Sequence, residues 1–266
     1  MTAFTSAQRS DEKLREQLQT LCELHNAIKG NAADYDCPVC RNKGVVYKLN
    51  GMQQVAQFCE CLPIRERIRR MKHSGLYEKI RSSTFASFRA DEPWQRHILD
   101  TAKRYAEKHD RPAFFIGGQT GCGKTHLCTA ICGELLRQGF DVQYFVWETY
   151  VKEILSRSGN SDRDEREKLM QPLYSSDTVY LDDFLRKDNP TQAERSVAFD
   201  VINHRYTEGK MTIVSSEHVM QKLHCVDGAI AGRITEMCGS EYCLNIDPDI
   251  RKDNRMRQHK SESAVI

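Results

Sequence analysis

The chain has 266 residues, enough for one full domain and a smaller module. Hydrophobic residues make up 39% and charged residues 29%, an ordinary globular balance that argues against a mostly disordered chain. The 39 basic and 37 acidic residues leave a net charge of +2, so overall charge neither favours nor excludes a nucleic-acid partner. No apolar run approaches the roughly 18 residues that cross a bilayer, and residues 1–9 lack the apolar segment of a secretory signal. We therefore expect a cytoplasmic protein without a membrane partner.

An amphipathic helix is predicted over residues 10–29, within an N-terminal region of residues 1–36. Residues at spacings of four and three form a heptad-like seam along it: Leu14, Leu18, Leu21, His25 and Ile28. Two heptads are too few for a stable free coiled coil, so this seam is expected to cover another surface. The pattern leaves open whether that surface is the rest of this chain or another protein.

Eleven cysteines are many for this length, and in a reducing compartment they are expected to be thiols or metal ligands. Four of them form two close pairs: Cys37, Cys40, Cys59 and Cys61. The segment between the pairs can form a hairpin that turns at Asn50-Gly51 and brings the pairs together. Four sulfur ligands suit a tetrahedral zinc ion, so residues 37–61 predict a structural zinc module, with unligated thiols as the alternative.

Residues 62–110 are predicted to contain a basic helix and a second, lead-in helix. Between Leu62 and Arg81, seven basic residues stand against two acidic ones. Such a helix either contacts phosphates or an acidic partner, or is a solvated linker. The lead-in helix begins near Asp91 and places an apolar face at Trp94, Ile98, Ala102 and Tyr105.

Strand-type apolar runs alternate with helical patterns from residue 111 to residue 260, and residues 261–266 form a tail. The expected strands are Ala113–Ile116, Val142–Val146, Val179–Leu181, Met211–Val214 and Tyr242–Ile246. Alternation of helices with strands of a fully buried type predicts an α/β domain with a parallel five-stranded sheet flanked by helices.

Residues 118–125 match the phosphate-binding pattern G-x-x-x-x-G-K-[ST], after a predicted strand and before a predicted helix. The residues of this P-loop are Gly118, Gln119, Thr120, Gly121, Cys122, Gly123, Lys124 and Thr125. The glycines let backbone N–H groups surround a β-phosphate at a helix N-terminus. Lys124 is predicted to reach the β- and γ-phosphates, and Thr125 to offer its hydroxyl to magnesium. His126, which follows directly, is counted with the nucleotide-binding residues.

Residues 178–183 read Thr-Val-Tyr-Leu-Asp-Asp, a buried strand that ends in two carboxylates. The strand delivers both acids to the carboxyl edge of the sheet, where the P-loop also lies. Asp182 is predicted to hold magnesium, and Asp183 to orient and polarise the attacking water. The alternative for Asp183 is a cap on the next turn.

Four ordered motifs carry a resemblance to a known family. They are GCGKTHL at 121–127, LDDF at 181–184, VINHRYTEGKMTI at 201–213 and AGRITEM at 231–237. From about residue 114 to residue 257, the sequence resembles the AAA+ ATPase domain of bacterial and phage helicase loaders of the DnaC and DnaI type. It is also similar to the transposition helper ATPases of the IstB type.

The resemblance implies an ATPase that uses ATP and magnesium, and it implies roles for three further residues. Arg233 is expected to be an arginine finger that reaches the nucleotide of a neighbouring subunit in a homo-oligomer. The sensor position after strand 211–214 is often Asn in this family, whereas Glu217 stands there in this chain. Either Ser216 or Glu217 would then take that role.

The resemblance also implies a function: loading a hexameric replicative helicase onto single-stranded DNA during replication initiation. Residues 1–36 are then the candidate helicase-binding region. The four-cysteine set favours a loader, since transposition helpers of the IstB type lack it. That helper activity is the second interpretation, and a helicase adaptor that hydrolyses nothing is the third.

Overall fold

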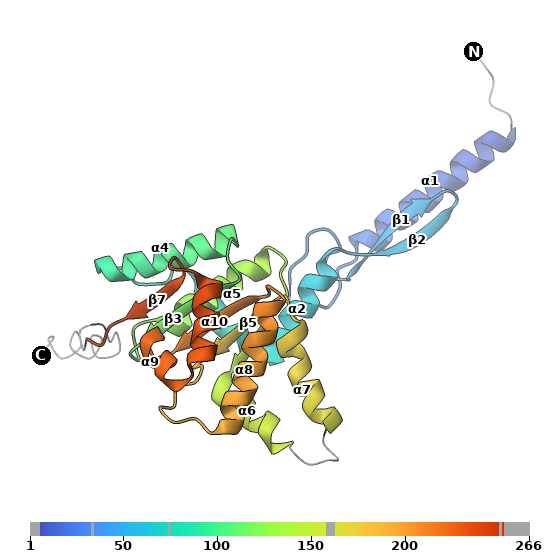
Figure 1. Ribbon diagram of the computed structural model, residues 1–266. Helices are drawn as coiled ribbons and strands as arrows, with labels where there is room; N and C mark the ends of the chain where they lie inside the picture. Colours follow the sequence, from blue (N-terminus) through green and yellow to red (C-terminus); the bar gives the residue numbers. More distant parts are fainter. Residues whose placement is uncertain (1–5, 33–34, 74–75, 158–162, 250–251, 253–266) are drawn as a thin grey trace, which may run out of the picture. The chain divides into compact units, whose positions relative to one another are not determined.

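The computed structural model describes residues 6–32, 35–73, 76–157, 163–249 and 252, and the chain divides into two compact units, Met1–Arg70 and Met71–Ile266. Figure 1 colours the elements in chain order. In the described part of the chain, no helix is both long enough and apolar enough to span a membrane.

The N-terminal unit consists of helix α1 (Ser6–Ala27) packed on a two-stranded antiparallel hairpin. The helix begins before the predicted Ser10, because residues 6–9 contain no helix breaker. Asn26 accepts a hydrogen bond from the backbone N–H of Tyr47 and donates one to its carbonyl, both at 2.8 Å. Only part of the predicted seam is covered, since Leu14, Leu21 and Ile28 remain 46%, 45% and 60% exposed.

The hairpin joins β1 (Val45–Asn50) to β2 (Gln53–Phe58), paired from Val45 opposite Phe58 to Asn50 opposite Gln53. Its two turn residues are Gly51 and Met52, one position later than predicted. Gly51 has a φ of 61°, which a two-residue hairpin turn requires. The hairpin brings the ends of its two strands together, and Cys37–Cys40 and Cys59–Cys61 meet there, as predicted.

The second unit is built on the predicted parallel five-stranded sheet, in the order β4-β5-β6-β3-β7. Its strands are β3 (Ala113–Gly118), β4 (Val142–Val146), β5 (Thr178–Asp182), β6 (Met211–Ser216) and β7 (Cys243–Ile246). Strand β3 lies between β6 and β7, whereas β4, the next strand in the chain, lies at the far edge. In parallel sheets, a reversal of strand order of this kind marks the carboxyl edge where ligands bind.

Helices cover both faces of this sheet (Figure 1). The remaining helices are α2 (Cys61–His73), α3 (Leu76–Ser82), α4 (Pro93–Lys108), α5 (Lys124–Arg137), α6 (Trp147–Ser156), α7 (Arg163–Ser175), α8 (Gln192–Thr207), α9 (Met220–Val226) and α10 (Gly228–Cys238). Helix α5 packs on one face with α3 and α4 against it, and α6, α8 and α10 follow the opposite face, as right-handed crossovers require. A capping box begins α8: Thr191 accepts from the Glu194 N–H, and Glu194 accepts from the Thr191 N–H.

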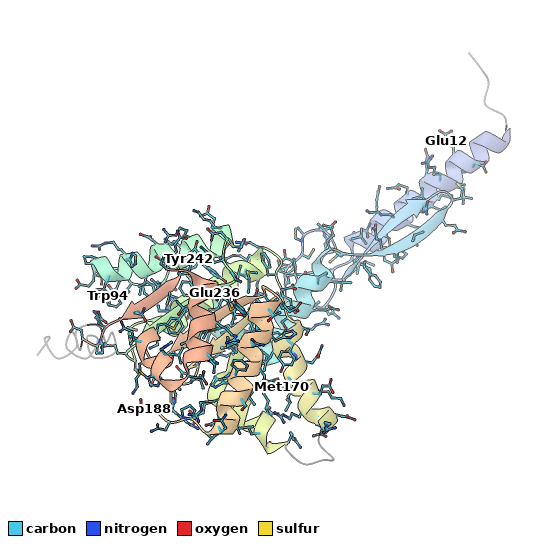
Figure 2. The ribbon with its side chains drawn as sticks, viewed as in Figure 1. Glu12, Trp94, Met170, Asp188, Glu236 and Tyr242 are labelled. Carbon is cyan, nitrogen blue, oxygen red and sulfur yellow. The ribbon has the colours of Figure 1, made fainter. Side chains whose placement is uncertain are left out.

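The predicted apolar face of α4 lies in the core of the second unit. Ile98, Ala102 and Tyr105 are buried, and Trp94 is partly buried against the same core. Tyr242, labelled in Figure 2, meets Tyr105 edge-on at 5.1 Å between ring centroids. Its hydroxyl donates to Asp110 at 2.8 Å, which ties the chain before β7 to the chain after α4.

Candidate nucleotide-binding site

The P-loop connects β3 to α5 through glycines in conformations that other residues rarely adopt. Gly118, Gly121 and Gly123 have φ values of 141°, 82° and 98°. A Cβ atom on Gly118 would lie 2.3 Å from the carbonyl oxygen of Ile246, so a side chain is also excluded there by space. Helix α5 begins directly after Gly123, and the positive end of its dipole faces the loop.

Lys124 lies inside this loop. Its side chain is buried, and Nζ donates to the carbonyl oxygens of Gly118 at 2.7 Å and Gln119 at 2.8 Å. The ammonium is therefore in the concave loop where the sequence motif predicts phosphate.

The structure brings the two predicted magnesium residues together. Thr125 Oγ1 donates to Asp182 Oδ1 at 3.2 Å, although 57 positions separate them. Asp182 is 5% exposed and accepts three more hydroxyl hydrogen bonds. These come from Ser215 and Tyr180 to Oδ1, at 2.6 and 2.7 Å, and from Tyr144 to Oδ2, at 2.8 Å.

The three hydroxyl donors Tyr144, Tyr180 and Ser215 were not predicted. Two of them are tyrosines in strand patterns, which the sequence presents only as core residues. Burial raises the pKa of both tyrosine hydroxyls, and the charge of Asp182 raises it further. Both hydroxyls therefore stay protonated and act as donors.

Asp183 has a left-handed backbone with a φ of 54°. The following residue is held on both sides by β6: Phe184 N–H donates to Ser215 O at 2.8 Å, and Ser216 Oγ donates to Phe184 O at 2.7 Å. These bonds maintain a backbone conformation that is unfavourable for a non-glycine residue. Burial raises the pKa of the Asp183 carboxyl, with further contributions from the charges of Asp182 and Glu217.

The two sensor candidates occupy different surroundings. Ser216 is fully buried, and its hydroxyl both donates to Phe184 O and accepts from His218 N–H at 3.1 Å. Glu217 instead accepts a hydrogen bond from Thr120 in the P-loop, at 2.9 Å. Of these two side chains, Glu217 is the one in contact with the P-loop.

Gln119 of the P-loop and His126, which follows the loop, contact segments for which the sequence predicted no role. Gln119 exchanges two hydrogen bonds with the backbone of Asp249, at 2.7 and 2.6 Å. His126 Nε2 lies 2.9 Å from Thr84 O, and its ring meets Phe88 edge-on at 5.3 Å. The segment before α4 therefore packs against the start of α5, a contact that no periodic pattern announced.

Arg233 on α10 is engaged with its own chain. Its Nε donates to Asn203 at 2.8 Å, and the guanidinium lies 4.6 Å from the ring centroid of Phe199, both on α8. A second hydrogen bond runs from the guanidinium to Ala229 O at 3.1 Å.

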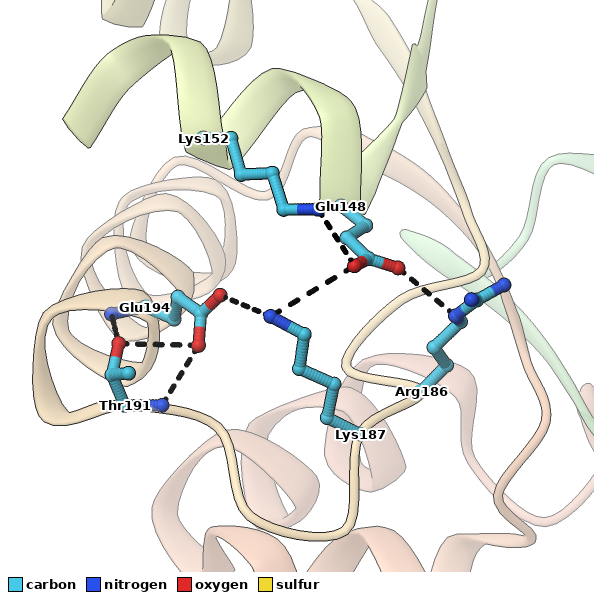
Figure 3. Close-up of polar contacts among 6 residues, drawn as sticks. All are labelled: Glu148, Lys152, Arg186, Lys187, Thr191 and Glu194. Carbon is cyan, nitrogen blue, oxygen red and sulfur yellow. Dashed lines mark hydrogen bonds and ion pairs between the residues drawn. The ribbon is translucent and has the colours of Figure 1, made fainter. Parts of the chain in front are cut away.

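An ion-pair network links α6, the segment after Asp183, and α8 (Figure 3). Glu148 pairs with Lys152 at 2.9 Å, with Arg186 at 3.0 Å and with Lys187 at 3.9 Å. Lys187 also pairs with Glu194 of the α8 capping box, at 2.7 Å. Partly exposed pairs contribute little stability individually, but together they fix the course of the chain that follows the aspartate pair.

The predicted zinc ligands form a buried cluster in the N-terminal unit. The ligand atoms of Cys37, Cys40, Cys59 and Cys61 all lie within 4.8 Å of one another. The two Sγ···Sγ distances across the pairs are 3.8 and 3.5 Å. Zinc–sulfur bonds of about 2.3 Å in a tetrahedron place sulfurs about 3.8 Å apart, so the donor set fits zinc.

Arg65 of the predicted basic helix serves this cluster. It is 1% exposed, and it donates to Cys61 Sγ at 3.3 Å and to Tyr35 O at 2.7 Å. Neither interpretation of the basic helix, phosphate contact or solvated linker, holds for this residue, because its charge faces the thiols.

The strand order, the P-loop after β3 and the aspartate pair at the end of β5 together define an ATP-binding unit of the AAA+ class. The family model described as "IstB-like ATP binding protein" matches residues 68–234, more than half of the chain. The chain belongs to this family.

Relatives extend the similarity beyond the family model. Phage-like element PBSX protein XkdC of Bacillus subtilis (strain 168) is 28% identical over 260 residues, covering 92% of this chain and 94% of that protein. Replicative helicase loader DnaC of Escherichia coli (strain K12) is 24% identical over 157 residues, covering 58% of this chain and 63% of DnaC.

Solved structures show the same fold. A crystal structure of the DnaC helicase loader has a TM-score of 0.53 at 17% identity, covering 65% of this chain and 99% of that one. AMPPCP-bound DnaA from Aquifex aeolicus has a TM-score of 0.53 at 20% identity, covering 69% of this chain and 55% of DnaA. The recognition of a loader-type AAA+ domain close to IstB is confirmed at the level of family and fold.

Proposed function

We propose that this protein is an ATP-dependent loader that places a hexameric replicative helicase on single-stranded DNA in the cytoplasm. The observation that carries the proposal is the combination of an AAA+ ATP site with a separate unit holding a four-cysteine cluster. Similarity to the helicase loader DnaC supports the ATPase unit, and the near full-length match to XkdC supports treating both units as one functional chain.

In this proposal, four side chains carry hydrolysis and a fifth serves as the sensor. Lys124 binds the β- and γ-phosphates after releasing Gly118 O and Gln119 O. Thr125 and Asp182 would hold magnesium, which when bound neutralises charge on the phosphates. Asp183 accepts a hydrogen bond from the attacking water and orients it towards the γ-phosphorus. Glu217, beside Thr120, is the sensor in this proposal, because the Ser216 hydroxyl already serves the backbone.

The ATPase unit assembles with copies of itself, and Arg233 then completes the nucleotide site of a neighbour. In this role the guanidinium exchanges Asn203 for the γ-phosphate of the adjacent subunit. A residue supplied only on assembly makes hydrolysis depend on the oligomer.

The N-terminal unit provides the helicase contact. Leu14, Leu21 and Ile28 recur every seven residues on α1 and the segment that follows it, and they are exposed, so they offer an apolar stripe to a partner helix. DNA contacts of the ATPase unit are electrostatic and independent of sequence, as loading at an arbitrary melted strand requires.

The family assignment itself favours one second candidate, a transposition helper of the IstB type. Such a helper would stimulate a transposase on DNA and leave helicase loading unchanged. The adaptor interpretation requires that no ATP be hydrolysed in any assembly.

A loading assay separates these candidates. The full chain, with ATP, is mixed with its host's replicative helicase and a covered single-stranded circle, and helicase retained on DNA is measured. We expect retention with the parent chain and with Lys210→Met, a partly buried lysine that donates to Ser175 O, and none with Lys124→Ala. No retention by the parent, or stimulation of a transposase instead, contradicts the loader. Equal ATP turnover by the parent, Lys124→Ala and Asp183→Asn, each with helicase and single-stranded DNA present, identifies the adaptor.

A further inference from the structure

The two oxygens of Asp182 have different partners. Oδ1 accepts from Thr125, Tyr180 and Ser215. Among the described residues, Oδ2 accepts from Tyr144 alone, at 2.8 Å. One donor leaves a lone pair of Oδ2 for a metal or for its bound water, whereas Oδ1 is fully occupied. The Tyr144 hydroxyl is therefore the group that fixes the oxygen still available.

Lys79 determines which way that hydroxyl points. Its Nζ lies 3.0 Å from the Tyr144 oxygen and 5.1 Å from the centroid of the Tyr144 ring. An ammonium group donates and has no acceptor, so the Tyr144 oxygen accepts from Lys79 and its own hydrogen is directed to Asp182. Lys79 therefore donates to Tyr144, and Tyr144 donates to Asp182.

Lys79 is itself held by a well-packed element. Leu76, on the same helix α3, is fully buried, and Ile80 packs on α5 beside Gly133. Helix α5 is the helix that begins at the P-loop lysine. The chain Lys79–Tyr144–Asp182 thus runs from a helix docked on the P-loop helix, through β4, to β5.

We propose that Tyr144 is a positioning residue for the carboxylate that holds magnesium, and that Lys79 acts through it by orienting its hydroxyl. The inference rests on the proposed ATP function. It adds two residues that do not contact the nucleotide, Tyr144 and Lys79, to the groups that position Asp182. The torsion of a carboxylate about its last bond is broad, so a fixed donor on Oδ2 reduces the cost of presenting that oxygen to the metal. Partners of this kind alter metal affinity more than they alter the fold.

Tyr144→Phe tests the proposal because it removes the hydroxyl and keeps the ring. The readouts are the free magnesium concentration that gives half-maximal binding of a fluorescent ATP analogue, and the binding of that analogue in EDTA. We expect about a tenfold higher magnesium requirement, with unchanged affinity in EDTA. Tyr150→Phe is the matched control, since its hydroxyl donates at 2.8 Å to Leu169 O, away from Asp182.

The role of Lys79 is tested with Lys79→Met, alone and combined with Tyr144→Phe. The single change should raise the magnesium requirement, and it should add nothing when Tyr144→Phe is already present, because Lys79 acts only through the lost hydroxyl. Lys210→Met, which removes another lysine bonded to one neutral oxygen, is the control.

Three results overturn the proposal. They are an unchanged magnesium requirement in Tyr144→Phe, a fall in affinity that is equal with and without magnesium, and an effect of Lys79→Met that persists in the double variant. The parent chain separates this inference from the function beneath it. Absence of magnesium-dependent ATP binding by the parent defeats the proposed function, whereas normal binding by the parent and by Tyr144→Phe alike defeats only the positioning role.

Discussion

At the scale of single residues, the adjacent carboxylates of Asp182 and Asp183 differ in their hydrogen bonds and in the charges beside them. Asp182 accepts four hydroxyl hydrogen bonds, whereas Asp183 is half-buried in a left-handed backbone beside the charges of Asp182 and Glu217. Environments that differ in this way give neighbouring acids different tasks. The four hydrogen bonds fix the orientation of the Asp182 carboxylate, whereas the Asp183 carboxyl has the raised pKa.

Asp183→Asn should abolish ATP hydrolysis, retain ATP binding and raise the melting temperature at pH 7. The gain arises because the ionised carboxylate is destabilised in the folded chain, as its raised pKa indicates. That cost is present above the folded pKa and disappears as the pH falls through it, so parent and variant should converge in acid. Melting curves from pH 7 downward measure this, and a variant less stable than the parent at pH 7 contradicts it.

The sequence predicted the P-loop and the aspartate pair because each depends on a local signal, spaced glycines with Lys124 or acids at a strand end. It did not predict Tyr144, Tyr180 or Ser215 as partners of Asp182. The hydroxyls of Tyr144 and Ser215 reach Asp182 only through strand order, since β4, β5 and β6 are neighbours in the sheet but far apart in the chain. Tyr180 precedes Asp182 by two positions on β5, and the strand pattern marks it only as a core residue.

At the scale of elements, the strands were predicted closely because buried parallel strands are continuous apolar runs. Differences lie at boundaries: α1 begins four residues before its predicted start, and the hairpin turn lies one residue later than predicted. Segment 84–88 has no periodic signal, so its packing against α5 was not predicted. The burial of Arg65 was not predicted either, because it depends on contacts with the cysteine cluster, part of which is distant in the sequence.

Arg205 anchors α8 to the edge of the sheet. It is fully buried and donates to Thr212 Oγ1 and Leu173 O at 2.9 Å and to Ser176 O at 3.1 Å. Burial lowers its pKa to about 10, so it remains charged at neutral pH. Arg205→Met should reduce the free energy of unfolding by about 3 kcal/mol or more, because several buried carbonyls lose their donor. Urea unfolding measures it. The control is Arg195→Met, a partly buried arginine whose side chain donates only to Gln192 of the same helix among the contacts of the described residues; equal stability of the two variants contradicts the anchoring role.

At the scale of the whole molecule, the four-cysteine cluster and the P-loop belong to separate units. Cys59→Ser, or chelation of the parent, should release about one zinc per chain and expose residues 35–70 to protease. ATP binding by residues 76–249 should persist, since the ATP site shares no residue with the cluster. Metal analysis, limited proteolysis and ATP titration measure these effects, and Cys225→Ser, an exposed cysteine, is the control. A metal-free chain with the same proteolytic pattern contradicts a structural zinc.

Arg233→Ala tests whether the nucleotide site is completed by assembly. ATP affinity of the chain should be retained, while turnover of the assembled protein should fall by about a thousandfold, the scale of a lost arginine finger. Arg195→Ala, on the neighbouring helix, should change neither quantity. Unchanged turnover in Arg233→Ala would show that this arginine acts only within its own chain, through its contacts to α8 and Ala229.

The central claim is that the P-loop and the aspartate pair hold magnesium and ATP together. A crystal structure of the chain with magnesium and AMPPCP tests it most directly. The account predicts phosphates within residues 118–125, Lys124 Nζ transferred from Gly118 O and Gln119 O to phosphate oxygens, and the metal beside Thr125 and Asp182. An analogue bound elsewhere, or a P-loop with Lys124 still bonded to its own carbonyls at saturating analogue, would contradict it.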